Sequence, residues 1–276
     1  TQHQLMRSSL SLGKLTTIFI THLHGDHIYG LPGLLASKTL NKALRPLTLY
    51  GPPGIKAFIE CSTGSAHSEL AYPFEIVEFA PGDTFAFDRF TVSVRPLVHS
   101  IESFAFDIKE HDTAGRLDEA KLRSEGLEPS PLYGELKRGR GVVFEGRRFE
   151  PGDYLLEPRK GRRVVIAGDN AEPEVLAEAL DDLDLLVHES TYTQPVFDAL
   201  EKKHQHTTAL QLGKSAQRHG VKNLIATHIS ARYGQSGAHS IEEIYNEIAA
   251  VYKGRVFIAN DFDCFELRRD GTLVKG

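Results

Sequence analysis

The sequence predicts an α/β fold in which two sheets pack face to face with helices on both outer sides, an αββα sandwich. Strands alternate with helices in the second half of the chain, and consecutive strands are expected between Phe74 and Ile108. Polar side chains that can bind metal recur where these strands end. With 276 residues the chain can build one large core, so we expect a single domain over 1–276 with an inserted arm over 110–163.

The first expected strand is the β-branched and aromatic run Thr17–Ile20. A helix is expected from Ile28 onward, because apolar residues follow it at helical spacing. The residues before the strand are polar, and a sheet of this kind normally has earlier strands, so we expect an N-terminal strand to be missing before Thr1. The other elements expected here are strands at 47–50, 74–79, 84–87, 91–98 and 104–108 and a helix at 55–61.

The second half of the chain repeats an order of strand followed by helix. Strands are expected at 164–167, 183–187, 224–226, 256–258 and 264–267, and helices at 117–122, 174–180, 209–219 and 241–252. The helix at 174–180 is expected to be capped near Asn170. This order places helices on the outer sides of the sheets.

The bulk composition is that of an ordinary globular protein, with 41% hydrophobic and 25% charged residues and a net charge of −5. Cys61 and Cys264 lie far apart, and we expect both to be reduced and buried, as in a cytoplasmic protein. No apolar run approaches the length of a membrane span, so neither export nor membrane insertion is expected.

The string Thr21–His27, THLHGDH, places three imidazoles and one carboxylate between a strand and a helix. Neutral imidazole and carboxylate are ligands for zinc or a similar divalent ion. One ion rarely takes four ligands from six residues, because so short a segment cannot wrap around it. Two neighbouring ions, each completed by distant ligands, fit better than one ion or a solvated polar loop. The candidate ligands are His22, His24, Asp26 and His27.

Three candidate partners for this string stand at the ends of other expected strands. His99 follows the strand at 91–98, Asp169 follows the strand at 164–167, and His228 follows the strand at 224–226. A carboxylate at a strand end can bridge two ions. Side chains that converge from separate strand ends define a site on one edge of the fold.

The middle of the chain is basic. The segment from Leu136 to Arg163 contains nine Lys and Arg residues and four Asp and Glu residues, a net charge of +5. The other residues of the chain therefore carry a net charge of −10. Such a stretch predicts contact with phosphates, and a solvated hairpin is the alternative.

These motifs make the sequence similar to the metallo-β-lactamase superfamily and, within it, to the ribonuclease Z (RNase BN) family. The resemblance runs along the whole chain. It is carried by TQHQLMRSS, IFITHLHGDHIYGLPGLL, LTLYGPPGIKAFIE, the basic arm, AGDN, LVHEST, HTTA and LIATHISARY. The order HEST, HTT and HISARY is more specific than HLHGDH, which lactamases, glyoxalase II and sulfatases share.

The resemblance implies two Zn²⁺ ions per subunit, with other divalent ions as an alternative. It assigns His22, His24 and His99 to one ion, Asp26, His27 and His228 to the other, and Asp169 to a bridge. Glu189 and His206 match a pair that assists proton transfer, and Asp26 matches the residue that orients the nucleophile. His188 is expected to support the site from behind. The remaining histidines, His3, His67, His111, His204, His219 and His239, are expected to have no role in the chemistry.

The resemblance also implies an endoribonuclease that removes the 3′ trailer of precursor tRNA, leaving a 3′ hydroxyl on the tRNA and a 5′ phosphate on the trailer. A basic, flexible arm of one subunit would hold the tRNA cleaved in the other, which implies a homodimer. Candidate substrate contacts are Arg232 in HISARY and Lys137, Arg138 and Arg140 in the arm.

Two other functions remain open. A hydrolase of the same superfamily that acts on a small ester, thioester or phosphodiester would have no use for the arm. A non-catalytic RNA-binding module would have lost ligands, whereas all seven positions are filled. The chain departs from the family where a glycine-rich first strand is absent, where GDN with Asn170 replaces GDT, and where Ser130-Pro131 replaces Gly-Pro.

Overall fold

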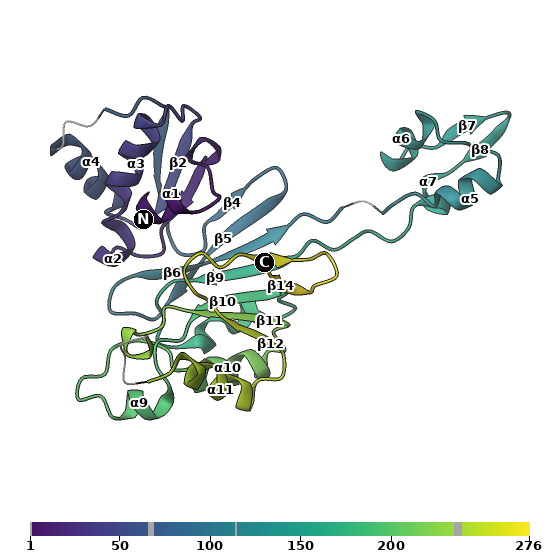
Figure 1. Cartoon of the computed structure of the whole chain (residues 1–276). Helices are drawn as coiled ribbons and strands as arrows, with labels where there is room; N and C mark the ends of the chain where they lie inside the picture. Colours follow the sequence, from purple (N-terminus) through teal and green to yellow (C-terminus); the bar gives the residue numbers. More distant parts are fainter. Residues whose placement is uncertain (1, 66–68, 114, 235–238) are drawn as a thin grey trace. The chain divides into compact units, whose positions relative to one another are not determined.

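The computed structural model describes residues 2–65, 69–113, 115–234 and 239–276. These residues form two compact units, which are described separately (Figure 1). Unit 1 comprises Thr1–Ala86, Val92–Ile108 and Arg163–Gly276, and unit 2 comprises Phe87–Thr91 and Lys109–Arg162.

Unit 1 contains two main sheets. The smaller is parallel, with the order β1 (Thr17–Phe19), β2 (Leu47–Gly51), β3 (Phe74–Glu78). The larger has the order β12-β11-β10-β9-β6-β5-β4. Its strands are β4 (Thr84–Ala86), β5 (Phe90–Leu97), β6 (Ser103–Glu110), β9 (Arg163–Ala167), β10 (Leu185–Glu189), β11 (Asn223–Thr227) and β12 (Arg255–Ile258). A hairpin of β13 (Phe265–Leu267) and β14 (Leu273–Lys275) follows.

Aromatic side chains join the facing sides of the two sheets. The rings of Phe19 on β1 and Phe106 on β6 lie 5.0 Å apart, and those of Phe79 and Phe104 lie 5.2 Å apart. Such tilted and edge-on ring pairs add to the apolar area they bury. The observed architecture is the α/β arrangement of two sheets that the strand pattern predicts.

Helices cover the outer sides through apolar stripes. α3 (Leu31–Leu40) and α4 (Ile55–Ser65) pack on the smaller sheet, where Leu35 and Ile55 lie fully buried against Leu49. α10 (Ala209–Arg218) and α11 (Ile241–Val251) pack on the larger sheet. Both of these begin with a capping box, from Thr208 and Ser240, which satisfies N–H groups that the first turn leaves free.

Several short elements of unit 1 were not predicted. They are α1 (Gln2–Arg7), η1 (Leu12–Lys14), α2 (Gly25–Ile28), α9 (Gln194–Asp198), η3 (Ala231–Tyr233) and β14. The helix expected at 174–180 is a 3₁₀ turn η2 (Pro173–Leu176) followed by α8 (Ala177–Leu180). Its N-cap is Glu172, two residues after Asn170, near which the cap was expected. The buried Asn170 side chain bonds to the backbone of Glu172 and to neighbouring strand ends.

The prediction that the cysteines are buried was also wrong. Cys61 and Cys264 are free and exposed, because Cys61 lies on the solvent side of α4 and Cys264 precedes the β13 hairpin. No helix among the described residues is both long and apolar enough to cross a membrane. His67 lies outside the described residues.

Unit 2 has a small core of its own. It contains α5 (Glu119–Ser124), α6 (Leu132–Lys137), α7 (Pro151–Tyr154) and the hairpin β7 (Val142–Phe144) and β8 (Arg147–Phe149). The helix expected at 117–122 begins two residues later, where Asp118 caps it by accepting from the Lys121 N–H. Leu122, Leu136 and Phe149 are almost fully buried in this core. Arg163, which the charge count included in the basic stretch, belongs to unit 1.

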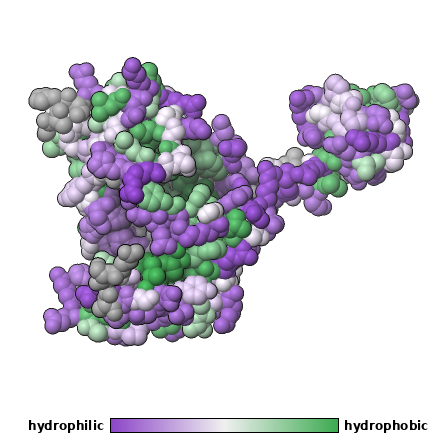
Figure 2. Space-filling model, viewed as in Figure 1, coloured by the Kyte–Doolittle hydropathy of each residue, from purple (hydrophilic) through white to green (hydrophobic). Residues whose placement is uncertain are grey.

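The surface of both units mixes hydrophilic and hydrophobic residues (Figure 2). In unit 2 the charged residues pair with one another. Arg138 and Arg140 both contact Glu135, Arg147 contacts Glu125, and Arg148 contacts Glu150. Counting all of unit 2, 13 basic side chains stand against 12 acidic ones, so the excess of positive charge is confined to its second half.

Candidate metal centre

The THLHGDH string leaves β1 in extended form and then enters a helical turn. The Ile20 N–H donates to the Tyr50 carbonyl, so the chain still pairs with β2 one residue past the strand. His24 is the N-cap of α2, and Asp26 and His27 lie within that turn. The sequence predicted a loop for all of these residues. Even so, the rings of His22 and His27 lie 4.0 Å apart.

Gly168 brings Asp169 to this string. The Phe104 N–H donates to the Thr21 carbonyl and the Gly168 N–H donates to the Phe104 carbonyl, so three segments remote in sequence are joined. A Cβ atom at Gly168 would lie 2.6 Å from the Cβ of Thr21. Only glycine therefore allows the end of β9 to approach the string so closely.

The structure brings all seven candidate ligands together. Asp169 Oδ2 lies 3.7 Å from Nε2 of both His22 and His99 and 3.4 Å from Nε2 of His228. Asp169 Oδ1 lies 3.6 Å from His27 Nε2, which in turn is 3.5 Å from Asp26 Oδ2. The donors form three groups that could each hold an ion: His22, His24, His99 and Asp169 in the first, Asp26, His27 and His228 in the second, and Asp169, His206 and His228 in a third that overlaps both.

The first group has the properties of a metal site. His22 is fully buried, and its Nε2 has no hydrogen-bond partner among the described residues. Burial, followed by the neighbouring imidazoles of His27, His24 and His99, lowers the pKa of His22 to about 3. A buried neutral imidazole with an unused lone pair is costly unless something binds it, and a metal ion does.

The spacing within this group also fits a shared ion. His99 Nε2 and His24 Nδ1 lie 3.2 Å apart. Two nitrogens that bind one tetrahedral zinc at ~2.0–2.1 Å are separated by ~3.3 Å. His99 Nδ1 donates to the Gln205 carbonyl at 2.9 Å, which fixes the ring and leaves Nε2 free to act as a ligand.

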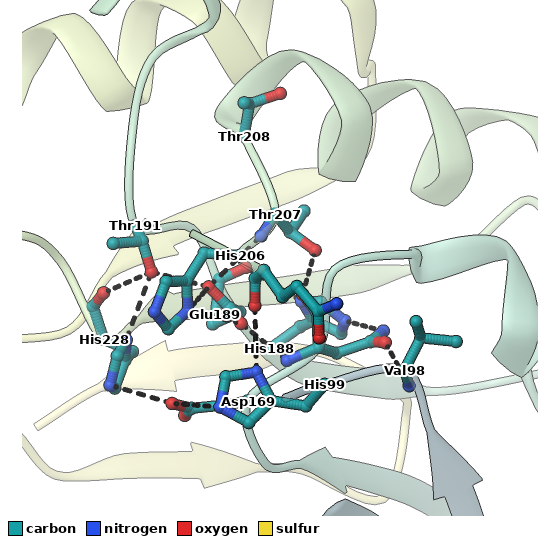
Figure 3. Close-up of polar contacts among 12 residues, drawn as sticks. Val98, His99, Asp169, His188, Glu189, Thr191, His206, Thr207, Thr208 and His228 are labelled. Carbon is teal, nitrogen blue, oxygen red and sulfur yellow. Dashed lines mark hydrogen bonds and ion pairs between the residues drawn. The ribbon is translucent and has the colours of Figure 1, made fainter. Parts of the chain in front are cut away.

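The buried Glu189 and the partly buried His206 form a pair at this site (Figure 3). His206 Nδ1 lies 3.1 Å from both carboxylate oxygens of Glu189. The carboxylate also accepts from the Asn170 N–H at 2.6 Å, the Thr191 hydroxyl at 2.5 Å and the Thr207 N–H at 3.2 Å. So many donors can hold a carboxylate ionised inside the protein.

The pKa values of the pair shift in opposite directions. Burial raises the pKa of Glu189, but the hydrogen bond and charge of His206 and the Thr191 hydroxyl lower it, and the pKa ends below its ordinary value. Burial lowers the pKa of His206, but the Glu189 carboxylate raises it more, and the pKa ends above its ordinary value. The pair therefore favours a protonated imidazole next to a carboxylate, as a proton donor requires.

Asn170 connects two strand ends behind the ligands. Its Oδ1 accepts from the Val98 N–H, next to His99, and its Nδ2 donates to His188 Nε2 at 3.0 Å. His188 is completely buried, and its Nδ1 donates to the Glu189 carbonyl at 2.8 Å. The structure thus places His188 behind the ligands, on the side away from the cavity.

A cavity of about 320 Å³ opens in front of the ligands. Its lining consists of His24, Asp26, His99, Ser100, Asp169, His204, Gln205, His206 and His228. His204 was expected to have no part in the site, yet it lines this cavity. Arg232 is exposed on η3, four residues after His228, and the arm candidates Lys137, Arg138 and Arg140 are exposed in unit 2.

Sequence reasoning did not find the roles of Thr191, Thr207 and Gln205, which contact the ligands or the buried pair. Gln205 and Thr207 flank the predicted His206, and Thr191 lies two residues after the predicted Glu189, within HEST. The one available signal in the sequence was that these residues lie close to a histidine motif. That signal does not show which neighbouring side chain or carbonyl contacts the site.

Comparison with known proteins agrees with this site. A model of the β-lactamase superfamily domain matches residues 1–123. The chain is 38% identical to ribonuclease Z of Marinobacter nauticus, in an alignment that covers 100% of this chain and 86% of the relative. It is 39% identical to ribonuclease BN of Erwinia tasmaniensis, covering 96% of this chain and 86% of the relative.

A solved structure has the same fold. The crystal structure of the short form of human tRNase Z superposes with a TM-score of 0.62 at 26% sequence identity, covering 95% of this chain and 82% of the human one. The fold is accordingly the α/β metallo-β-lactamase fold. The chain belongs to the ribonuclease Z/BN family of the metallo-β-lactamase superfamily.

Proposed function

We propose that this chain is a zinc-dependent endoribonuclease that cleaves the 3′ trailer from precursor tRNA. The observation that carries the proposal is its similarity to ribonuclease Z over the whole chain, together with the cluster of seven candidate imidazole and carboxylate ligands, five of which line one cavity. The products would be a tRNA with a 3′ hydroxyl and a trailer with a 5′ phosphate.

The proposed metal centre holds two Zn²⁺ ions. His22, His24 and His99 would bind one ion, Asp26, His27 and His228 the other, and Asp169 both. When bound, such ions stabilise the charge that develops on a phosphoryl group and lower the pKa of a water molecule from 15.7 to about 7. Asp26, which is exposed to the cavity, would orient the attacking water by accepting its hydrogen bond.

His206 is the proposed proton donor to the leaving 3′ oxygen. Its Nδ1 bonds to Glu189, so Nε2 is the ring atom available to a substrate in the cavity that His206 lines. Glu189 would fix the ring and stabilise its protonated form. A positioned general acid of this kind contributes typically 10²–10⁴-fold.

Unit 2 is the proposed docking arm for tRNA, covering the segment that the sequence assigned to 110–163. Its second half carries the positive excess, including the exposed side chains of Lys137, Arg138 and Arg140. Tertiary RNA structure is recognised mainly through shape and backbone, which suits a preformed unit with surface cations. Arg232 of unit 1, four residues after His228, would contact another phosphate.

We further propose a homodimer in which the arm of one subunit holds the tRNA cleaved by the other. Light scattering of the purified protein measures its mass directly. Mixing an arm-deleted variant with an Asp169→Ala variant tests whether the arm of one subunit can serve the metal centre of the other. Recovery of pre-tRNA cleavage in the mixture supports the proposal, and its absence at concentrations where mixed dimers form contradicts it.

The test of the proposed function is to map the cleavage site on a precursor tRNA with and without chelator, and to measure the zinc content of the active protein. Cleavage after the unpaired nucleotide that follows the acceptor stem, abolished by chelator and restored by Zn²⁺, supports the proposal. Turnover of a lactam or thioester panel without cleavage of the precursor would instead favour a small-molecule hydrolase.

Deleting residues 110–160 tests the role of the arm. We expect cleavage of precursor tRNA to be lost while hydrolysis of a small phosphodiester remains, since the ligands all belong to unit 1. An equal fall in both activities would show that the segment supports the fold of unit 1 and does not dock tRNA.

A further inference from the structure

Thr191 stands between the buried pair and the metal ligand His228 (Figure 3). Its Oγ1 lies 2.5 Å from Glu189 Oε2 and 3.1 Å from His228 Nδ1. The residue is only 4% exposed, and both of its backbone groups are bonded: its N–H donates to the Thr207 carbonyl, and its carbonyl accepts from the Ser230 N–H. The hydroxyl is thus held in place between the two side chains.

The direction of these hydrogen bonds follows because the Thr191 hydroxyl has only one proton to donate. A hydroxyl carries one proton, and the carboxylate of Glu189 is both the nearest and the strongest acceptor it meets. The carbonyl of His228, at 3.0 Å, is a weaker branch of the same bond. With its proton directed to Glu189, the Thr191 oxygen presents a lone pair to His228 Nδ1, which must then carry a proton to bond to it.

This assignment fixes the tautomer of His228. With the proton on Nδ1, the lone pair of the neutral imidazole is on Nε2, the atom that lies 3.4 Å from Asp169 Oδ2 and faces the other ligands. Metal-binding histidines commonly donate their second N–H to a carboxylate, which orients the ring. Here a hydroxyl is inserted between the histidine and the carboxylate.

The backbone of His228 shows why the ring needs such support. Its φ of 54° lies in the left-handed region, which is strained for a residue other than glycine. Thr191 contacts both the ring nitrogen and the carbonyl of His228, so it holds the side chain and the strained backbone at once.

We propose that Thr191 is a positioning residue that links Glu189 to His228, so that one carboxylate orients two imidazoles. Glu189 bonds to His206 directly and to His228 through the Thr191 hydroxyl. The inference rests on the proposed metal centre, because it gives His228 the role of a ligand. It extends that centre by connecting a ligand to the residues that handle the leaving-group proton.

The first test is the tautomer of His228 in the wild-type protein, read from long-range ¹H–¹⁵N NMR correlations of the histidine rings. The His228 signals are assigned by their loss in a His228→Gln variant. A proton on Nδ1 in both the zinc-loaded and the zinc-free protein supports the link, and a proton on Nε2 in the zinc-free protein overturns it. The tautomer of His228 can be measured without bound zinc. The measurement therefore tests the link through Thr191 even if the proposed metal centre is wrong.

The second test compares two variants of Thr191. Thr191→Val keeps the shape and removes the hydroxyl, and we expect zinc affinity, measured by chelator competition, to fall 10–100-fold for one of the two ions. Thr191→Ser keeps the hydroxyl, and we expect affinity within about 3-fold of wild type. Wild-type affinity in the valine variant, or equal losses in both variants, would overturn the proposal.

The third test separates the two branches that meet at Glu189. His206→Ala removes the direct branch, and we expect it to lower turnover while leaving zinc affinity close to wild type. A double-mutant cycle combines Glu189→Gln with Thr191→Val. The fold-loss of zinc affinity in the double variant should be smaller than the product of the fold-losses in the two single variants. Independent effects would show that the carboxylate does not act on His228 through Thr191.

Discussion

The two units of this chain differ in whether their charged and polar side chains are buried or exposed. At the candidate metal centre of unit 1, Asp169, Glu189 and His188 are almost fully buried, and each contacts polar groups of its neighbours. In unit 2 the buried side chains form an apolar core, while arginines and glutamates pair at its surface. Buried polar groups require fixed partners, whereas surface ion pairs contribute little and can be exchanged.

This difference suits the roles proposed for the two units. A metal site needs ligands held within a fraction of an ångström, which buried networks provide. A surface that binds the RNA backbone needs cations that can leave one partner for a phosphate. Each prediction below tests one side of this contrast, beginning with the largest expected effect.

Asp169→Ala should cause the largest loss. Asp169 approaches the ring nitrogens of four histidines, so removing it exposes both groups of ligands to mutual repulsion and leaves no shared carboxylate. We expect zinc to be lost and phosphodiester hydrolysis to fall roughly 10⁴-fold, which corresponds to about 5.5 kcal/mol. Elemental analysis and hydrolysis of a small phosphodiester measure the two effects. The exposed Asp181→Ala is the control.

Leu136→Ala should destabilise unit 2 alone. Leu136 is completely buried in the core of that unit, and a leucine truncated in a core costs about 2–5 kcal/mol. We expect faster hydrogen exchange over 115–162 and weaker binding of precursor tRNA, with small-substrate hydrolysis within about 2-fold of wild type. Val143→Ala, at a 64% exposed position of the same unit, should change neither. Faster exchange at the β9–β11 amides would contradict the separation of the two units.

Asp107→Asn should change the acid stability of unit 1. Asp107 is buried and bonds to Arg163 and Arg95; burial raises its pKa, but the two guanidinium groups lower it, and it ends below the ordinary 3.8. A lowered pKa contributes stability above pH 3.8 that disappears as the pH falls through the folded value. We expect the variant to be less stable at pH 7 by about 1.5–3 kcal/mol, the range for hydrogen bonds to charged groups.

The difference in stability between Asp107→Asn and wild type should shrink as the pH drops below 3.8, where the wild-type carboxyl group takes up a proton. Urea denaturation followed by circular dichroism in the presence of chelator measures this at each pH. Glu60→Gln, in an exposed pair on α4, should stay within 0.5 kcal/mol of wild type. A difference that is the same at pH 7 and pH 3 would show that the charge of Asp107 does not stabilise the fold.

Glu135→Gln should have the smallest effect, and it should be a gain. Glu135 contacts both Arg138 and Arg140, so the substitution frees two cations of unit 2. We expect KM for precursor tRNA to fall about 2–3-fold, with a salt dependence steeper by about one unit in the log–log slope. Glu128→Gln removes the same charge from a different arginine, Arg123, and should leave both quantities unchanged. A fall in affinity would place these arginines outside the RNA contact.

Most of the fold could be predicted from local patterns. The apolar run Thr17–Ile20 and the alternation of strands and helices after Val164 predicted elements within a few residues of those observed. The seven candidate ligands were named from residue type and from their place at strand ends. These features are encoded locally, because strand and helix periods and the affinity of imidazole for metal depend only on nearby residues.

Tertiary structure alone decided how those residues meet. The sequence does not show that Gly168 passes against Thr21, that the Asn170 side chain bonds to Val98 as well as to Glu172, or that Thr191 lies between Glu189 and His228. Nor does it show that the arginines of unit 2 have acidic partners upstream in the chain, such as Glu125 for Arg147. These contacts join residues remote in sequence, and which donor meets which acceptor is settled only when sheets, turns and cores have packed in three dimensions.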